Sequence, residues 1–304
     1  MTHRIDTGGC IPGTQDPAFS VWRPRRETSP IVLAAPHGGR NYPPDVLANV
    51  RGSEPASPLL RLEDRLIDGI AAKLASQTGT HLVVAHAPRA VIDLNRAPDD
   101  LDWGMVRGAA KGKGAHSRRS RAGLGLIPRR LSGSGELWKR PLEPHDLERR
   151  IDHIHRPYHA TLDGIMTEVR DRWGIAVLID LHSMPPLKPA PGGAAEFVIG
   201  DRFGMSAHHA LSARALDVLG KAGRRAAHNR PYAGGYVLER HGDTRRSLHA
   251  LQIEICRTCY LDRNFSRPSA RMAGIVQLLS VLTRQLADEA VTLAHPDRFA
   301  KAAE

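Results

Sequence analysis

The chain has few cysteines, few aromatic residues and no long hydrophobic run, and each shortage excludes a class of protein. Three cysteines in 304 residues cannot form the disulfide framework of a small secreted domain, so we expect a reducing cytoplasm. No apolar run approaches the roughly 20 residues of a membrane span. Residues 1–10 lack the apolar stretch of a signal peptide. The sequence therefore predicts a cytoplasmic protein without a membrane partner.

Several common catalytic motifs are also missing. The sequence contains no Gly-x-Ser-x-Gly elbow, which argues against serine hydrolysis. Its glycine-rich fragments match neither the phosphate-binding loop nor the dinucleotide-binding fingerprint. Nucleotide chemistry is therefore not expected.

The net charge of +11 is concentrated in one segment. Between residues 107 and 150 stand twelve Lys or Arg and four Asp or Glu. A basic segment often indicates nucleic acid or another anionic partner. Aromatic residues make up only 5% of the chain and none interrupts the arginines of residues 111–130, so a base-stacking platform is not expected. We interpret the segment as a solvated loop, with an anion-holding loop at the substrate and a polynucleotide surface as alternatives.

Short apolar runs alternate with longer segments of helical periodicity. Strands are predicted at residues 30–35, 80–85, 90–94, 176–181 and 248–256, and helices at residues 57–76, 143–172 (ended or kinked at Pro157), 206–223 and 267–286. This alternation is typical of an α/β sandwich, a single domain in which helices flank a mixed, mostly parallel sheet. The predicted boundaries are an N-terminal arm, loosely attached, at 1–28, a catalytic domain at 29–290 with a basic insertion at about 104–140, and a C-terminal tail at 291–304.

Polar residues follow three of the predicted strands. His37 follows residues 30–35, His182 follows residues 176–181, and Asn95 and Arg96 follow residues 90–94. In open α/β sheets, ligands bind at the carboxyl ends of strands, so these side chains are expected to converge. A single histidine after a strand is common without any function. The prediction of a binding site depends on several polar residues following neighbouring strands.

Two histidines and a carboxylate are the ligand set of a hydrolytic zinc site, which leaves one position open for water. The candidate carboxylates are Glu63 and Asp64, at the start of the helix that follows His37. Acids in a first helical turn are also common without a metal, because they complement the helix dipole. The sequence alone leaves the choice between the two open.

Glu254 stands between two isoleucines in the run LQIEIC. Because side chains alternate along a strand, Glu254 shares a face with Gln252, and that face is either exposed to solvent or buried for a purpose. A buried carboxylate with a raised pKa suits a general base that acts on metal-bound water. The sequence alone leaves both interpretations open.

A set of segments in fixed order resembles the N-formylglutamate amidohydrolase family. They span roughly residues 30–285, and the Asp-Leu-Asn-Arg and Asp-Leu-His-Ser segments are the more specific. The segments are Pro36–Gly39, Glu63–Asp68, Pro88–Arg96, Gly125–Pro128, Arg156–His159, Asp180–Met184, Asn229–Gly235 and Leu251–Ile255.

The resemblance implies an architecture similar to that of zinc carboxypeptidases and succinylglutamate desuccinylases. It implies one zinc per chain, held by His37, Asp64 and His182, with Glu63 as the alternative acid. By the same likeness Glu254 would be the general base, Arg89 would polarise the scissile carbonyl, and Asn95 and Arg96 would grip the substrate's carboxylate. The basic insertion departs from the family pattern.

The implied activity is the hydrolysis of a small anionic N-acyl amino acid, foremost N-formyl-L-glutamate to formate and L-glutamate, late in histidine breakdown. One alternative is a related metallohydrolase that acts on another N-acyl amino acid or a small peptide. The other is an inactive nucleic-acid-binding module that uses residues 107–150. The sequence does not specify an oligomeric state.

Overall fold

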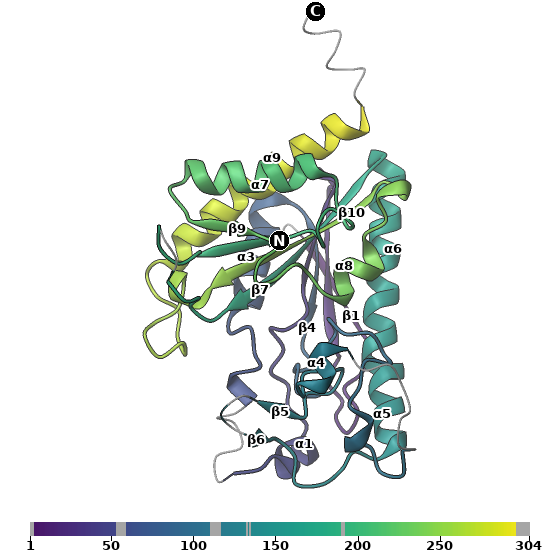
Figure 1. Cartoon of the computed structure of the whole chain (residues 1–304). Helices are drawn as coiled ribbons and strands as arrows, with labels where there is room; N and C mark the ends of the chain where they lie inside the picture. Colours follow the sequence, from purple (N-terminus) through teal and green to yellow (C-terminus); the bar gives the residue numbers. More distant parts are fainter. Residues whose placement is uncertain are drawn as a thin grey trace, which may run out of the picture.

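The structure is a computed structural model that describes residues 3–52, 59–109, 117–131, 133, 135–189 and 192–295. Its main strands are β1 (His3–Gly8), β2 (Phe19–Pro24), β3 (Ile31–Ala35), β4 (His81–Ala85), β7 (Ala176–Met184), β8 (Phe197–Gly200), β9 (Ala226–His228) and β10 (Leu248–Cys256). They form one eight-stranded sheet in the order β1-β2-β4-β3-β7-β10-β8-β9 (Figure 1). The neighbours β4, β3, β7 and β10 are mutually parallel, and β1, β2 and β8 introduce antiparallel pairs. The predicted mixed sheet is confirmed.

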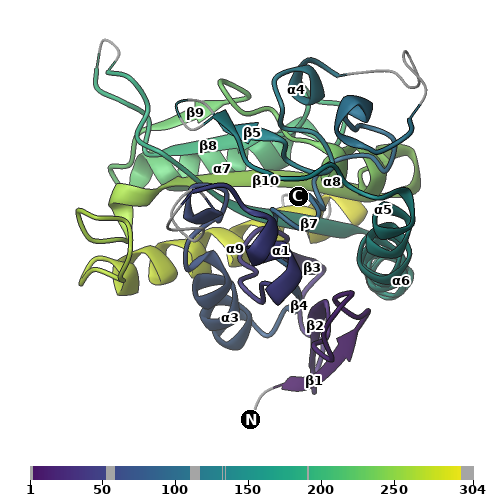
Figure 2. The ribbon, with the colours of Figure 1, turned by 90° about the horizontal axis from the view of Figure 1, so that it is seen from below.

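Helices cover both faces of this sheet. One face carries α3 (Ile67–Thr78), α7 (His209–Lys221) and α9 (Met272–Ala294), and the other carries α6 (Arg156–Trp173) and α8 (Tyr236–His241) (Figures 1 and 2). Ile31 and Leu33 pack into the first core, whereas Val32 and Ala34 pack into the second. Strands buried on both faces appear in sequence as largely apolar runs, which is why the central strands of this sheet could be predicted. None of the described helices is long and apolar enough to cross a bilayer.

Shorter elements gather beyond one end of the sheet, at the bottom of Figure 1. They are α1 (Pro44–Asn49), α4 (Arg118–Arg121), β5 (Arg130–Leu131), β6 (Gly135–Glu136) and α5 (Pro144–Arg150). Much of the predicted basic insertion lies here, and its residues 110–116, 132 and 134 are outside the described residues. Arg107 pairs with Glu143, and Arg129 pairs with Asp102 and Glu136, so part of the basic charge is compensated within the fold.

The predicted strand at residues 90–94 is wrong, because this segment forms a compact turn. Val91 N and Ile92 N both donate to the Pro88 carbonyl, and the Asp93 carboxylate accepts from Asn95 N at 2.9 Å. The apolar side chains of the segment are nevertheless buried in the core. Burial without extended geometry explains why the pattern resembles a strand.

Two predicted helices differ at their boundaries. The helix predicted over 57–76 is interrupted: Leu59 and Leu60 are helical, residues 61–66 are not, and α3 begins at Ile67, after Leu66 takes a left-handed conformation with φ of 60°. Residues 57 and 58 are outside the described residues. The helix predicted over 143–172 is not broken at Pro157, because a π-helical turn, η2 (Ile151–His155), joins α5 to α6 and Pro157 falls in the first turn of α6. Single 3₁₀ turns are η1 (Trp103–Met105), η3 (Thr244–Arg246) and η4 (Arg257–Cys259).

The N-terminal residues belong to the sheet. The sequence predicts a loosely attached arm over 1–28, but β1 pairs with β2, and β2 pairs in turn with β4. Phe19 is 1% exposed and meets Tyr158 of α6 edge to face, with ring centroids 5.5 Å apart. The arm therefore contributes to the core. Residues 296–304 of the predicted C-terminal tail are outside the described residues, and α9 occupies 291–294.

Replacing Phe19 by Ala tests this integration. We expect the free energy of unfolding to fall by about 3–5 kcal/mol, because a buried aromatic ring is lost and a cavity remains. Urea unfolding of Phe19→Ala measures the change. Ile5→Ala, at an exposed position of β1, is the control and should cost about 1 kcal/mol or less. A loss below about 0.5 kcal/mol for Phe19→Ala would instead favour a detached arm.

Candidate active site and metal centre

Four neighbouring parallel strands deliver the candidate residues to one edge of the sheet. His37 lies two residues after β3, and Arg89 lies in the loop after β4. His182 is inside β7, which extends to Met184, rather than after the strand as the sequence predicts. Glu254 of β10 stands directly opposite His182 in the parallel register. Parallel strands end at the same edge, so residues far apart in sequence meet there.

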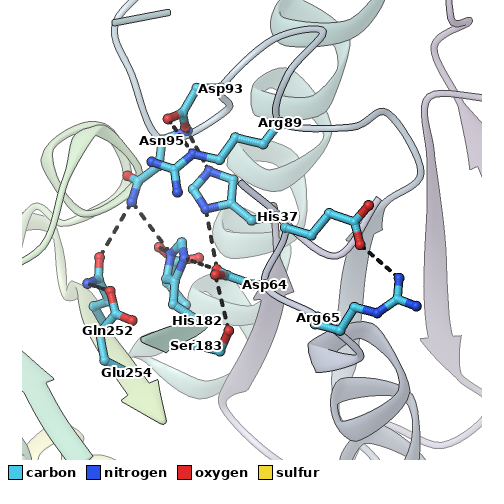
Figure 3. Close-up of polar contacts among 12 residues, drawn as sticks. His37, Asp64, Arg65, Arg89, Asp93, Asn95, His182, Ser183, Gln252 and Glu254 are labelled. Carbon is cyan, nitrogen blue, oxygen red and sulfur yellow. Dashed lines mark hydrogen bonds and ion pairs between the residues drawn. The ribbon is translucent and has the colours of Figure 1, made fainter. Parts of the chain in front are cut away.

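His37, Asp64 and His182 converge on one point (Figure 3). Asp64 Oδ2 lies 2.9 Å from His182 Nδ1 and 3.4 Å from His37 Nδ1. One ligand atom from each of the three side chains falls within 4.8 Å of the others, and all three residues are buried. The Asp64 turn is fixed by the bond from Asp64 N to the His37 carbonyl at 3.0 Å.

A second acid holds the far nitrogen of each imidazole. His37 Nε2 lies 2.7 Å from Asp93 Oδ1, and His182 Nε2 lies 2.8 Å from Asp180 Oδ2. Carboxylates in this position fix the tautomer and ring orientation of histidines that bind metals. His37 Nδ1, on the inner side, is buried without a hydrogen-bond partner among the described residues. An inward nitrogen that lacks a partner, beside a second nitrogen and a carboxylate, fits the donor set of a divalent metal such as zinc.

Two acids of this cluster, Asp64 and Asp93, are held in their ionised form. Burial alone would raise the pKa of Asp64, but the neighbouring imidazoles of His182 and His37 lower it well below its ordinary value. Burial would likewise raise the pKa of Asp93, and the charges of Arg89 and His37 lower it instead. A carboxylate must be deprotonated to bind a metal, so Asp64 is in the state that such binding requires.

Glu63 points away from the cluster. Its Oε1 accepts a hydrogen bond from the Tyr42 hydroxyl at 2.9 Å, and its Oε2 pairs with Arg65 at 3.0 Å. The sequence leaves the choice of metal-ligating acid between Glu63 and Asp64 open, and the structure brings Asp64 to the two histidines.

Glu254 is buried, with 7% of its surface exposed. β10 lies between β7 and β8 in the sheet, and all nine of its residues are buried. Gln252 Nε2 donates to Glu254 Oε1 at 2.9 Å, which fixes the carboxylate. Burial is the largest influence on this group and raises the pKa of Glu254 to about 7, with His182 opposing the rise. The interpretation of an exposed strand face is therefore wrong.

Asn95, Arg96 and Arg89 are anchored by their neighbours. Asn95 Oδ1 accepts from Val237 N at 2.9 Å, and its amide nitrogen lies 3.5 Å from His182 Nε2. Arg96 Nη1 donates to the Asn95 carbonyl at 2.8 Å. Arg89 Nε donates to Asp93 Oδ2 at 2.8 Å, so the same acid steadies both Arg89 and His37. Side chains held in this way are ready to bind a ligand without reorganising.

All seven predicted site residues line one cavity of about 230 Å³. They are His37, Asp64, Arg89, Asn95, Arg96, His182 and Glu254. The cavity also carries Arg61, Arg119, Arg257, Tyr232 and Gln252, among others. Its positive lining beside two buried carboxylates suits a small anionic ligand.

Asp93 and Asp180 were missed as site residues. Each is an acid inside an apolar run, two residues before a predicted site residue, in the segments Asp-Leu-Asn and Asp-Leu-His. An acid that is fully buried needs a partner, and that signal could have singled them out.

Comparisons with known proteins identify the family of this chain. Residues 29–261 match the family model for N-formylglutamate amidohydrolase. The chain is 28% identical over 278 residues to the N-formylglutamate deformylase of Pseudomonas putida, covering 84% of this chain and 90% of that protein. It is 27% identical over 271 residues to the N-formylglutamate deformylase of Pseudomonas aeruginosa, covering 86% and 92%.

A solved structure shares the fold over most of both chains. The crystal structure of N-formylglutamate amidohydrolase from Ralstonia eutropha JMP134 has a TM-score of 0.81 and 29% sequence identity, and the match covers 90% of this chain and 98% of that one. The predicted resemblance is confirmed by the family match and by these relatives. The chain therefore belongs to the N-formylglutamate amidohydrolase family, whose members are hydrolases that act on an amide bond.

Proposed function

We propose that this protein hydrolyses N-formyl-L-glutamate to formate and L-glutamate with one zinc ion per chain. The observation that carries the proposal is the meeting of a His-Asp-His cluster, a buried Glu254 and several arginines in one small cavity. His37, Asp64 and His182 would hold the metal. The names of the relatives support the substrate.

Zinc in a site of this kind polarises a carbonyl group and brings the pKa of a bound water close to 7. Glu254 accepts a proton from the attacking water at its carboxylate. The water oxygen forms a bond to the formyl carbon, and the carbon–nitrogen bond breaks. Glu254 then returns the proton to the leaving nitrogen, so that formate and the free amino acid result. A carboxylate with a pKa near 7 suits both transfers.

Arginines position the substrate in this proposal. Arg96, with Asn95, binds the α-carboxylate, because a planar guanidinium matches both carboxylate oxygens. Arg89 presents its guanidinium to the oxygen of the scissile carbonyl, where negative charge develops. Its bond to Asp93 keeps it in place as that charge forms.

Formate release tests the proposal. Purified protein loaded with zinc is incubated with N-formyl-L-glutamate, and formate and L-glutamate are both quantified. We expect the two products in equal amounts, and no release after the metal has been removed. Absence of formate from the metal-loaded protein would contradict the proposed activity.

Arg96→Lys should weaken substrate binding. Lysine keeps the charge but loses the paired donors of the guanidinium, and it also loses the bond to the Asn95 carbonyl. We expect KM for N-formyl-L-glutamate to rise by about 10-fold or more, the effect of one charged hydrogen bond, while the metal content stays unchanged. Steady-state kinetics with metal analysis measure both. Wild-type kinetics would remove Arg96 from the site.

A longer N-acyl amino acid or a small peptide is the second candidate substrate. A further cavity of about 700 Å³ shares Asn95, Arg96, Arg119, Gly234 and Gly235 with the first. Space beyond the carboxylate-binding residues favours an extended substrate. Relative rates on N-formyl-L-glutamate and on an N-formyl dipeptide decide between the two.

We also place the reaction in the cytoplasm, a placement that the three free thiols support. A role late in histidine breakdown rests on the family resemblance.

A further inference from the structure

The cavity carries more positive charge than the proposed reaction uses. Five of its lining residues are arginines: Arg61, Arg89, Arg96, Arg119 and Arg257. Arg89 and Arg96 already have roles in the proposed reaction. Arg257 is engaged by the protein itself, through the Glu63 carbonyl and the Ser183 hydroxyl.

Arg119 is different, because its guanidinium makes no hydrogen bond or ion pair with the residues that the structure describes. It is exposed, and it lines both the 230 Å³ cavity and the 700 Å³ cavity beside it. It belongs to the basic segment for which the sequence left open a role in holding an anionic substrate. A cationic side chain at the junction of two cavities is placed to meet a ligand.

The backbone that carries Arg119 is tied to the carboxylate-binding residues. Ser117 Oγ accepts from Arg119 N at 3.1 Å and donates to Asp100 Oδ2 at 3.0 Å. Leu124 N donates to the Arg119 carbonyl at 2.8 Å, and the Leu124 carbonyl accepts from Arg96 Nε at 3.0 Å. Arg119 and Arg96 are thus held on either side of one residue, and Arg119 is not simply an arginine on a solvated loop.

The positive charges of Arg89 and Arg119 act on Arg96. Burial lowers the pKa of Arg96, Asp93 opposes this, and the positive charges of Arg89 and Arg119 add to the lowering. Like charges that face a common cavity repel until an anion comes between them. The arrangement therefore favours a ligand with more than one negative group.

We propose that Arg119 binds a second carboxylate of the substrate, carried by the amino-acid side chain, while Arg96 binds the α-carboxylate. The site then selects N-acyl amino acids with acidic side chains. This inference rests on the proposed function and names the residue that sets its substrate class. A guanidinium and a carboxylate form a charge-assisted hydrogen bond, which is stronger than the bond to a neutral amide.

Two substrates of nearly equal size test the inference: N-formyl-L-glutamate and N-formyl-L-glutamine. In Arg119→Gln, we expect kcat/KM for the glutamate substrate to fall by about 10- to 100-fold, the effect of losing a hydrogen bond to a charged group. The fall should appear mainly in KM. The kcat/KM for the glutamine substrate should change by no more than about 3-fold. Arg119→Lys should have a kcat/KM for the glutamate substrate between those of the wild type and Arg119→Gln.

Arg121→Gln is the matched control, because Arg121 is an exposed arginine of the same helix that lines neither cavity. It should leave both substrates unchanged. If Arg119→Gln keeps the wild-type preference for glutamate over glutamine, or if Arg121→Gln lowers it equally, the inference is wrong while the proposed function stands. If wild-type protein releases no formate from either substrate, the proposed function fails and the inference fails with it.

Discussion

Glu254→Gln is expected to lower the turnover of N-formyl-L-glutamate by at least about 100-fold, the lower end of what general-base catalysis contributes. Glutamine keeps the size of the side chain but cannot accept a proton from water. Glu254 lies opposite His182 in the sheet and is fixed by Gln252, so the substitution leaves the frame of the site in place. Steady-state formate release measures the loss.

The metal content separates a base from a ligand in this variant. Zinc in Glu254→Gln should remain near one per chain, whereas loss of a ligand would lower it. Glu168→Gln is the control, because Glu168 is exposed on α6 and pairs with Arg23 away from the cavity. It should behave as wild type. Parent turnover in Glu254→Gln would contradict the assignment of Glu254 as the base.

His37→Ala and His182→Ala should each abolish most metal binding and activity. Substitution of the acids behind metal-binding histidines typically costs about 10- to 100-fold in metal affinity, and loss of the histidine itself should cost more. Each substitution also removes the imidazole that pairs with a buried acid, Asp93 behind His37 or Asp180 behind His182. We therefore expect some loss of stability as well, with the fold retained. Elemental analysis after dialysis against zinc measures the bound metal.

His145→Ala is the control for these variants, because His145 is exposed and pairs only with Asp146 among the described residues. It should bind zinc as wild type does. Circular dichroism of all three proteins checks that the fold is intact. Full metal occupancy in both His37→Ala and His182→Ala would rule out this cluster as the metal site.

The central strands were predictable because they are buried on both faces. β3 appears as an uninterrupted apolar run, and β7 and β10 are largely apolar, with Asp180 and Glu254 among their few polar residues. The helices that cover these strands show clear periodicity. Residues 90–94 have the same composition but form a turn, because the Asp93 side chain satisfies the backbone locally. The N-terminal strands were missed because their mostly polar, partly exposed sequence resembles a loose arm, and only pairing with β4 makes them part of the sheet.

The candidate site was predictable where the residues end strands or begin a known motif. His37 and His182 were found in this way, whereas Asn95 and Arg96 were found because they follow a buried apolar segment that the sequence predicts as a strand and that forms a turn. The structure brings all four into one cavity. The outer acids were not, because the pairing of Asp93 with His37 spans 56 residues and depends on the fold. The choice between Glu63 and Asp64 likewise needed the turn that directs neighbouring acids to opposite sides.

A zinc titration of metal-free protein tests whether the hydrolysis depends on one bound metal ion per chain. Aliquots of zinc are added to the dialysed wild-type chain, and the initial rate of formate release from N-formyl-L-glutamate is recorded at each ratio. We expect a negligible rate without metal, a linear rise as zinc is added, and a plateau at one zinc per chain. Full activity in the metal-free protein, or a rate that does not respond to zinc or to any other divalent metal, would contradict this expectation.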